Sequence, residues 1–248
     1  MSDVQIAPRP DAHAYGLAPA PEALRYDWGN DEPAEVAGIL HTMMPSNARV
    51  LDVGCGTGAV TLIANRGKNN ELWGIEPEPE RARLAGVRGI RVTCGTLDRA
   101  FVEGHPPFDV VMLADVLEHV AAPGELLERA ASAVKPDGLV LLSVPNAAHW
   151  TMRLHLLYGR FDYAETGIRD ATHLRWFTEK TIRALCRHCG LEVVAMRHSA
   201  GNDLPEYRRH LPWRLLPGRV RRPLVRRLTR AAPRLFGCQH VVAAKPRG

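Results

Sequence analysis

Residues 49–58, R-V-L-D-V-G-C-G-T-G, combine a short apolar run with glycines at alternate positions. The pattern predicts a buried strand over 49–53 and a helix over about 57–65, joined by a glycine-rich turn. Glycine lets the backbone adopt positive φ angles and approach a ligand closely. The N-terminus of the helix then presents N–H groups to an electron-rich ligand, and Asp52 places a carboxylate where a ligand ammonium could lie. Three glycines exceed what a plain turn needs, so the segment is predicted to bind a ligand.

Strands and helices alternate along the rest of the chain. Further strands are predicted at 72–75, 90–93, 108–113, 139–144, 191–196 and 238–244. Helices are predicted from near residue 31, with Pro33 in the first turn, and at 78–84, 123–134 and 178–188, and a turn is predicted at 135–138. This alternation predicts an α/β fold with a doubly wound, seven-stranded, mostly parallel sheet. Ligands of such sheets bind beyond the carboxyl ends of the strands.

Composition indicates a globular chain with enough apolar material for a core. The 248 residues are 46% hydrophobic and 24% charged. Neither a signal peptide nor a membrane-spanning run is visible, and five cysteines do not suggest a disulfide framework, so we expect a cytoplasmic location. Residues 1–30, with four prolines, are expected to form a loose arm, and residues 31–248 one domain.

Basic residues are concentrated at the C-terminal end. Residues 201–248 hold 12 Lys+Arg and 2 Asp+Glu, a balance of +10, against −5 for residues 1–200. Residues 197–237 are interpreted as a basic, Arg-rich insertion, or flap, before the last strand, broken into short pieces by Pro212, Pro217, Pro223 and Pro233. Within it Leu224, Val225 and Leu228 are predicted to share one face, and Arg226, Arg227 and Arg230 to project away. Arginine interleaved with leucine suits an anionic membrane surface, so 208–234 is predicted to touch the inner face of a membrane peripherally. A flap whose arginines are merely solvated is the alternative.

Two ligand classes remain open on the glycine pattern alone. The segment G-C-G-T-G-A (54–59) also satisfies the dinucleotide-binding fingerprint G-x-G-x-x-G/A. Glu76 lies 22 residues after Gly54, at the end of the second strand, where a ribose-binding acid belongs in either class. A nicotinamide-dependent oxidoreductase therefore stands beside a nucleoside-binding enzyme.

Four segments together resemble the class I S-adenosylmethionine-dependent methyltransferases. They are D-V-G-C-G-T-G (52–58), E-L-W-G-I-E-P (71–77), F-D-V-V-M-L-A-D-V-L-E-H-V (108–120) and L-V-L-L-S-V-P-N (139–146). Their order and spacing match over about 35–196. The segment D-A-T-H-L-R-W-F-T (170–178) is similar to one in quinone-biosynthesis O-methyltransferases and surface-glycan methyltransferases. The resemblance implies a Rossmann-like methyltransferase fold, S-adenosylmethionine as cofactor, and a small-molecule, glycan or lipid-linked acceptor.

The resemblance also implies roles for individual residues. Gly54, Gly56 and Gly58 would line the methionine portion of the cofactor, and Asp52 would support that loop. Glu76 would bind the ribose diol, and Thr96 and Leu97 would lie at the adenine. Ala114 and Asp115 would lie at the sulfonium and the methyl group. The family often has an acid directly after the glycine of the third loop, where Thr96 follows Gly95 here. Asp98 or backbone groups could substitute for that acid.

Histidines are the candidates for the proton transfer that an oxygen nucleophile needs. His119, His149 and His173 are predicted as catalytic residues, with His155 a weaker candidate, and each could instead be a structural histidine. Glu118 and His119 are two adjacent ligands and do not make a metal site, so no metal is predicted. Cys186 and Cys189 are expected in a helical core. A nucleic-acid methyltransferase that uses the Arg-rich flap is a further alternative. No Asn-Pro-Pro-Tyr-type motif follows the fourth strand, which disfavours amino methylation of bases.

Overall fold

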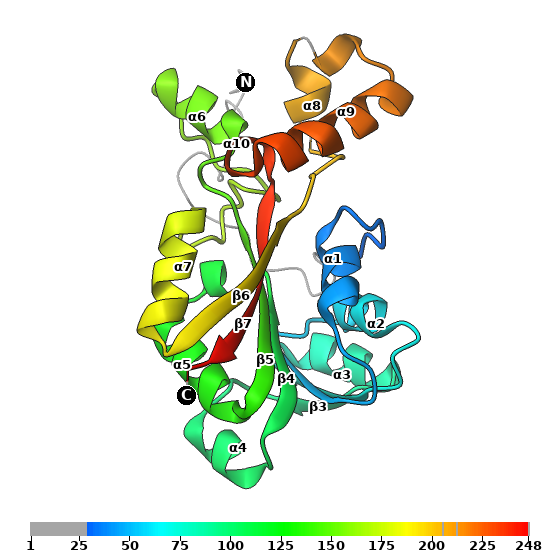
Figure 1. The fold of residues 1–248 in the computed structure, drawn as a ribbon, viewed down its shortest axis with the longest axis vertical. Coiled ribbons are helices and arrows are strands. Elements are labelled where there is room, and N and C mark those ends of the chain that lie inside the picture. Colours follow the sequence, from blue (N-terminus) through cyan, green and yellow to red (C-terminus); the bar gives the residue numbers. More distant parts are fainter. Residues whose placement is uncertain (1–28, 205, 212, 248) are drawn as a thin grey trace, which may run out of the picture.

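The computed structural model describes residues 29–204, 206–211 and 213–247, and it forms one seven-stranded sheet. Residues 1–28 of the expected arm lie outside the described residues. The strands are β1 (Arg49–Val53), β2 (Glu71–Glu76), β3 (Arg91–Cys94), β4 (Phe108–Ala114), β5 (Val134–Pro145), β6 (Leu191–His198) and β7 (Gln239–Pro246). Their order is β3-β2-β1-β4-β5-β7-β6, and only β7 runs antiparallel to its neighbours (Figure 1). The predicted doubly wound, mostly parallel sheet is confirmed.

Helices cover both faces of this sheet (Figure 1). One face carries α1 (Val36–Met43), α2 (Ala59–Asn65) and α3 (Pro79–Val87), and the other carries α4 (Arg99–Gly104), α5 (Pro123–Ala133) and α7 (Glu179–His188). The central strands β1, β4 and β5 are apolar on both faces because each face packs under helices. Cys186 and Cys189 lie in this core, as expected.

Two local predictions need correction. Helix α1 begins at Val36, five residues later than predicted, because Glu35 takes the extended N-cap conformation while its carboxylate accepts hydrogen bonds from the backbone of Gly201 and Asn202. The turn predicted at 135–138 lies inside β5. Val134 pairs with Phe108 while Leu139 pairs with Val110, so the segment is an irregularity within the strand rather than a connection.

A group of helices stands beyond the carboxyl end of β5, and we call it the cap. It comprises α6 (Trp150–Leu157), α8 (Glu206–Arg209), the short 3₁₀ helix η3 (Trp213–Leu215), α9 (Gly218–Ala231) and α10 (Pro233–Phe236). Figure 1 shows the cap at the top of the molecule. Two aromatic residues, Trp150 and Trp213, pack around the fully buried Tyr207, whose hydroxyl accepts a 3.2 Å hydrogen bond from the indole of Trp150.

Helix α9 corrects the prediction of short pieces in the flap. The helix runs through Pro223 for 14 residues. Val225 and Thr229, four residues apart, are its buried positions, whereas Leu224 is 37% exposed. Arg226 does not project freely, since it pairs with Glu32. The buried face is therefore set by the i, i+4 spacing of Val225 and Thr229 rather than by the three predicted aliphatic residues. No helix in the described part of the chain is both long enough and apolar enough to cross a bilayer.

Candidate active site

The loops that follow β1, β2 and β3 meet at one edge of the sheet. The backbone N–H groups of Gly54 and Cys55 donate to the carbonyl of Ile75 at 2.7 and 3.1 Å. The N–H of Gly95 donates to the carbonyl of Glu76 at 3.0 Å. Parallel strands end at the same edge, so the predicted ligand-binding loops lie side by side, as the switch-point rule requires.

The glycine loop has a left-handed backbone at each predicted glycine. Gly56 has φ of 56°, and a Cβ built there would meet no other atom within 4 Å. Gly58 has φ of 82° and is the N-cap of α2, with Ile90 close behind it. The open side of Gly56 is the place where a ligand can approach the backbone, whereas Gly58 is needed for close packing and for its φ.

Glu76 is buried, with 4% of its surface exposed, and is therefore not a solvated surface acid. Its carboxylate accepts hydrogen bonds from the backbone N–H of Gly56 at 2.8 Å and of Glu78 at 3.0 Å. The side chain therefore ties the glycine loop to the end of β2. Each oxygen retains lone pairs for further donors, as a ribose diol would require.

Asp52 lies below the glycine loop with 2% of its surface exposed. Its Oδ2 accepts a 2.5 Å hydrogen bond from the Thr61 hydroxyl on α2, and Oδ1 has no hydrogen-bond partner among the described residues. Burial, opposed by the hydrogen bond from Thr61 and aided by the nearby Glu76 carboxylate, raises the pKa of Asp52 to about 7. This contact joins Asp52 to α2, the helix that follows the glycine loop, and its role in supporting the loop stays a prediction.

The two residues predicted at the adenine, both in the loop after β3, differ in exposure. Thr96 is exposed, whereas Leu97 is 1% exposed and packs with Phe101 in the main core. The carboxylate of Asp98 caps α4 by accepting from the N–H of Phe101 at 2.7 Å. That bond uses Oδ1 of Asp98. Oδ2 could take the place of the acid that the family often has directly after the glycine, where this chain has Thr96.

Asp115 directly follows β4 and has a left-handed backbone, with φ of 54°. Its Oδ1 accepts from the Ser143 hydroxyl at 2.6 Å and its Oδ2 from the Gln239 side chain at 2.8 Å. Burial raises its pKa. Ser143 and Gln239 were missed from the sequence, although a lone serine within the apolar strand L-V-L-L-S-V was a usable signal. Ala114, the last residue of β4, is half-buried beside it.

His119 is joined to the segment after α6 by a chain of hydrogen bonds. Its Nδ1 lies 3.0 Å from the Thr172 hydroxyl, which donates to Asp170 at 2.7 Å. The Thr172 oxygen must then accept from Nδ1–H, which assigns the proton to Nδ1 and the lone pair to Nε2. The His173 ring lies 4.8 Å from that of His119, centroid to centroid. The structure therefore brings two of the three predicted catalytic histidines together.

Glu118 completes a cluster of three residues that could hold a metal ion. The ligand atoms of Glu118, His119 and His173 lie within 4.8 Å of one another. Glu118 is 1% exposed, and neither carboxylate oxygen has a hydrogen-bond partner among the described residues. Burial raises its pKa well above the ordinary value. His173, more than 50 residues away in sequence, supplies the third ligand that the adjacent pair lacked.

His149 and His155 lie elsewhere. His149 is the N-cap of α6, is fully buried beside Trp150 and Tyr207, and has a pKa lowered to about 3 by burial. His155 lies further along α6, near His210, and burial lowers its pKa as well. The geometry groups His149 with the packing of the cap rather than with His119 and His173.

Comparison with known proteins now identifies the family. A family model described as a methyltransferase domain matches residues 28–196. The chain belongs to this methyltransferase family. This membership confirms the resemblance to class I methyltransferases and disfavours the oxidoreductase. The flap and β7 lie beyond the matched residues.

Curated relatives and solved structures agree with this methyltransferase assignment. A ubiquinone biosynthesis O-methyltransferase from Neisseria meningitidis is 33% identical over 156 residues, which are 59% of this chain and 64% of that protein. The protein of the same description from Xylella fastidiosa is 31% identical over 67% of this chain and 71% of its own length. The chain thus spans just under two thirds of the Neisseria relative. A methyltransferase structure from Archaeoglobus fulgidus, 19% identical with a TM-score of 0.58 over 85% of this chain and 92% of that one, shares the fold.

The residues at the strand ends fit S-adenosylmethionine, the cofactor of this fold family. Gly56 has open space where a side chain would otherwise stand, and the buried Oδ1 of Asp52 lacks a partner among the described residues. Glu76 holds the loop with lone pairs to spare. A glycine-lined edge with a carboxylate at Glu76 suits a cationic nucleoside better than a pyrophosphate, because the carboxylate would repel the latter.

Proposed function

We propose that this chain transfers a methyl group from S-adenosylmethionine to an oxygen of a small-molecule acceptor, with His119 as the general base. The hydrogen-bond chain Asp170–Thr172–His119 is the observation that carries the proposal, because it gives one ring nitrogen a defined lone pair. The curated relatives are O-methyltransferases, which favours oxygen as the nucleophile.

The roles of the side chains follow from their positions. Glu76, Asp52 and the backbone of Gly56 would hold the cofactor, and Asp115 would stand at its reacting end. When bound, S-adenosylmethionine supplies a methyl group on a cationic sulfur that departs as a neutral thioether, so no acid is needed. The chain must then align the acceptor, which by itself contributes several kcal/mol, and remove its proton. His119 Nε2 takes that proton, and Asp170 stabilises the resulting imidazolium through Thr172.

Labelling tests the function and the base separately. The protein is incubated with S-adenosylmethionine carrying a deuterated methyl group and with extracts of small molecules, glycans and lipids, and labelled products are sought by mass spectrometry. His119→Ala should lower the labelling rate by a factor of about 10² to 10⁴ with unchanged affinity for S-adenosylhomocysteine. His155→Ala, in α6, is the control and should retain the rate. Unchanged labelling by His119→Ala would remove the base assignment alone.

Calorimetry separates the function from its alternative. S-adenosylhomocysteine should bind, whereas NAD should give no heat. Binding of NAD alone would overturn the methyltransferase proposal as a whole.

The cap supports a finer proposal about the partner, namely that 208–234 touches an anionic membrane surface. Leu211 and Leu215 are 65% and 72% exposed. Exposed arginines stand near them in the sequence, at 214 and 219, and further along α9, at 227 and 230. Such a surface would favour a lipid-linked acceptor over a free glycan. Vesicle flotation tests it. Recovery with anionic vesicles should exceed that with neutral ones, and Leu215→Ser should reduce it. Equal recovery with both vesicles would remove the proposal.

A further inference from the structure

A cavity of about 740 Å³ lies between the end of β5, one side of α7 along its length and the start of α10. This volume is in the range of small-molecule pockets. Its lining includes one acid, Glu179, and five cationic side chains, namely Arg153, Lys180, Arg183, Arg187 and Arg234. Five cations against one carboxylate leave a strongly positive cavity.

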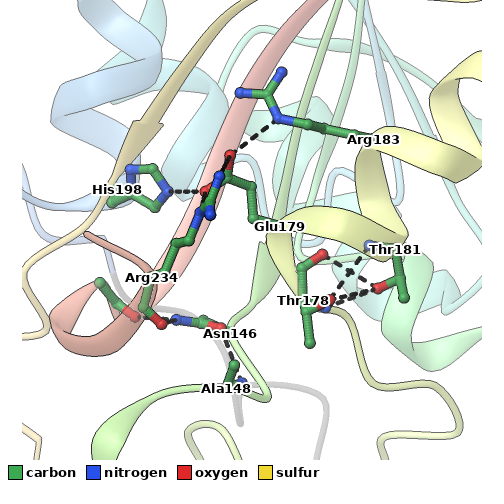
Figure 2. A network of polar contacts seen from close by, with 9 residues as sticks. Asn146, Ala148, Thr178, Glu179, Thr181, Arg183, His198 and Arg234 are labelled. Carbon is green, nitrogen blue, oxygen red and sulfur yellow. Dashed lines mark hydrogen bonds and ion pairs between the residues drawn. The ribbon is translucent and has the colours of Figure 1, made fainter. Parts of the chain in front are cut away.

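Glu179 orients two of the cations rather than neutralising the group (Figure 2). Its carboxylate accepts from Nε of Arg183 at 3.1 Å and from Nε of Arg234 at 3.0 Å. Hydrogen bonding to Arg234 lowers the pKa of Glu179, which keeps the carboxylate ionised. Each guanidinium retains further N–H donors, because arginine carries five. Lys180 and Arg187 form no ion pair with any residue that the structure describes.

The walls of the cavity are held by the backbone of the cap. The Asn146 amide, which is fully buried, donates to the carbonyls of Gly237 at 2.8 Å and Arg234 at 3.2 Å (Figure 2). These bonds fix α10, and with it Arg234, to the end of β5. The cationic groups are therefore carried by anchored elements rather than by loose loops.

His240 supplies an observation that does not depend on the surface charges. It lies on β7, lines the cavity and is fully buried, yet neither ring nitrogen has a hydrogen-bond partner among the described residues. The ring of His198 stands 5.1 Å away, centroid to centroid. A buried N–H without an acceptor is costly. An anion in the cavity would supply that acceptor.

We propose that this cavity binds the phosphate group of a small ligand, with His240 donating a hydrogen bond and the five cations balancing the charge. Arginine forks match the oxygens of phosphate, and a site with a large excess of positive charge favours a multiply charged phosphate over a single carboxylate. The site differs from the methyl-transfer site, because adjacent side chains of β7 point to opposite sides: Gln239 contacts Asp115, whereas His240 lines the cavity. It goes beyond the proposed function and does not require it.

Calorimetry with inorganic pyrophosphate tests the cavity. The full chain is titrated at constant ionic strength without cofactor or acceptor, and saturable binding is expected. Arg187→Gln should weaken binding about tenfold, and Lys180→Gln with Arg187→Gln about a hundredfold, since each removes a charge-assisted contact. Arg99→Gln, an exposed arginine of α4, is the matched control and should leave the affinity within twofold. Absence of saturable binding, or equal weakening by the control, would overturn the proposal.

NMR of the histidine rings provides a second measurement, which non-specific binding of anions to the basic surface would not change. The ring signals of His240 should shift with pyrophosphate and remain still with the same ionic strength of sodium chloride, and signals that do not move would overturn the proposal. Competition identifies the source of the phosphate. Displacement of pyrophosphate by anionic vesicles indicates a lipid headgroup, and retention indicates a soluble phosphate ester.

Discussion

The strand-end site and the cap are held together by different forces. The strand-end site, formed by the loops after β1, β2 and β3, is stabilised by hydrogen bonds between backbone groups and buried carboxylates. The carboxylate of Glu76, for example, accepts a hydrogen bond from the N–H of Gly56. In the cap, aromatic rings pack around Tyr207, and ion pairs from Arg222 and Arg226 to Glu32 join α9 to the segment before α1. The contacts of the first region join neighbouring strand ends, whereas those of the second join the helices of the cap to one another and to the segment before α1. We therefore expect a substitution in one region to leave the stability or ligand affinity of the other region unchanged.

The largest expected effect lies in the cap. Tyr207→Ala should cost about 3 to 5 kcal/mol of cap stability, because it empties a fully buried aromatic site. Hydrogen exchange should report faster opening of α8 and α9, while the affinity for S-adenosylhomocysteine stays within twofold. A loss of that affinity in the same variant would show that the cap and the strand-end site are not independent. Tyr207→Phe, which loses only the bond from Trp150, is the matched control and should cost about 1 kcal/mol.

The next effect concerns the pH dependence of the strand-end site. Burial raises the pKa of Asp52 from 3.8 to about 7, so the folded chain retains this proton where the unfolded chain has lost it. The free energy of unfolding should therefore fall as the pH rises from about 4 to 7, by roughly 3 to 4 kcal/mol from this group. Denaturant titrations should show that Asp52→Asn removes this part of the slope. Identical slopes for the variant and the parent chain would contradict the assignment.

A metal ion bound by Glu118, His119 and His173 would stabilise the folded chain, but it would occupy the Nε2 lone pair of His119 that the proposed general base needs, so the two roles exclude each other. Two imidazoles and one carboxylate suit Zn²⁺, which at about 100 times its Kd should add about 2.7 kcal/mol to the free energy of unfolding. Thermal melts with and without metal should show the shift, and Glu118→Gln should abolish it. Glu128→Gln, an exposed acid on α5, is the control. A shift that survives Glu118→Gln would place the metal elsewhere.

The smallest effect concerns cofactor affinity. Glu76→Ala should weaken S-adenosylhomocysteine binding by about 1.5 to 3 kcal/mol, through loss of the ribose contact and of the bond to Gly56. Calorimetry measures it, with Glu80→Gln, an exposed acid of α3, as the control. Because the cap is held independently, hydrogen exchange of α9 should not change. An unchanged affinity would contradict the role of Glu76.

The sequence predicted the strand-end region well because its signals are local. Apolar runs and alternate glycines lie within ten residues of one another, and the order of the strands follows from their alternation with helices. Helix α6 and the continuity of α9 through Pro223 were missed, since they depend on rings and ion pairs brought together by the fold. His173 was predicted as a candidate base, but its place beside Glu118 depends on the path of the chain between β5 and α7.

Strand β7 gives the molecule an unusual vulnerability. Adjacent side chains of a strand point to opposite sides, so Gln239 reaches Asp115 while His240 faces the basic cavity. If β7 shifted its pairing with β5 and β6 by one residue, the side chains of Gln239 and His240 would exchange sides. The contact with Asp115 and the histidine of the cavity would then be lost together. A one-residue deletion in the stretch before this strand should therefore be more harmful than most substitutions within it.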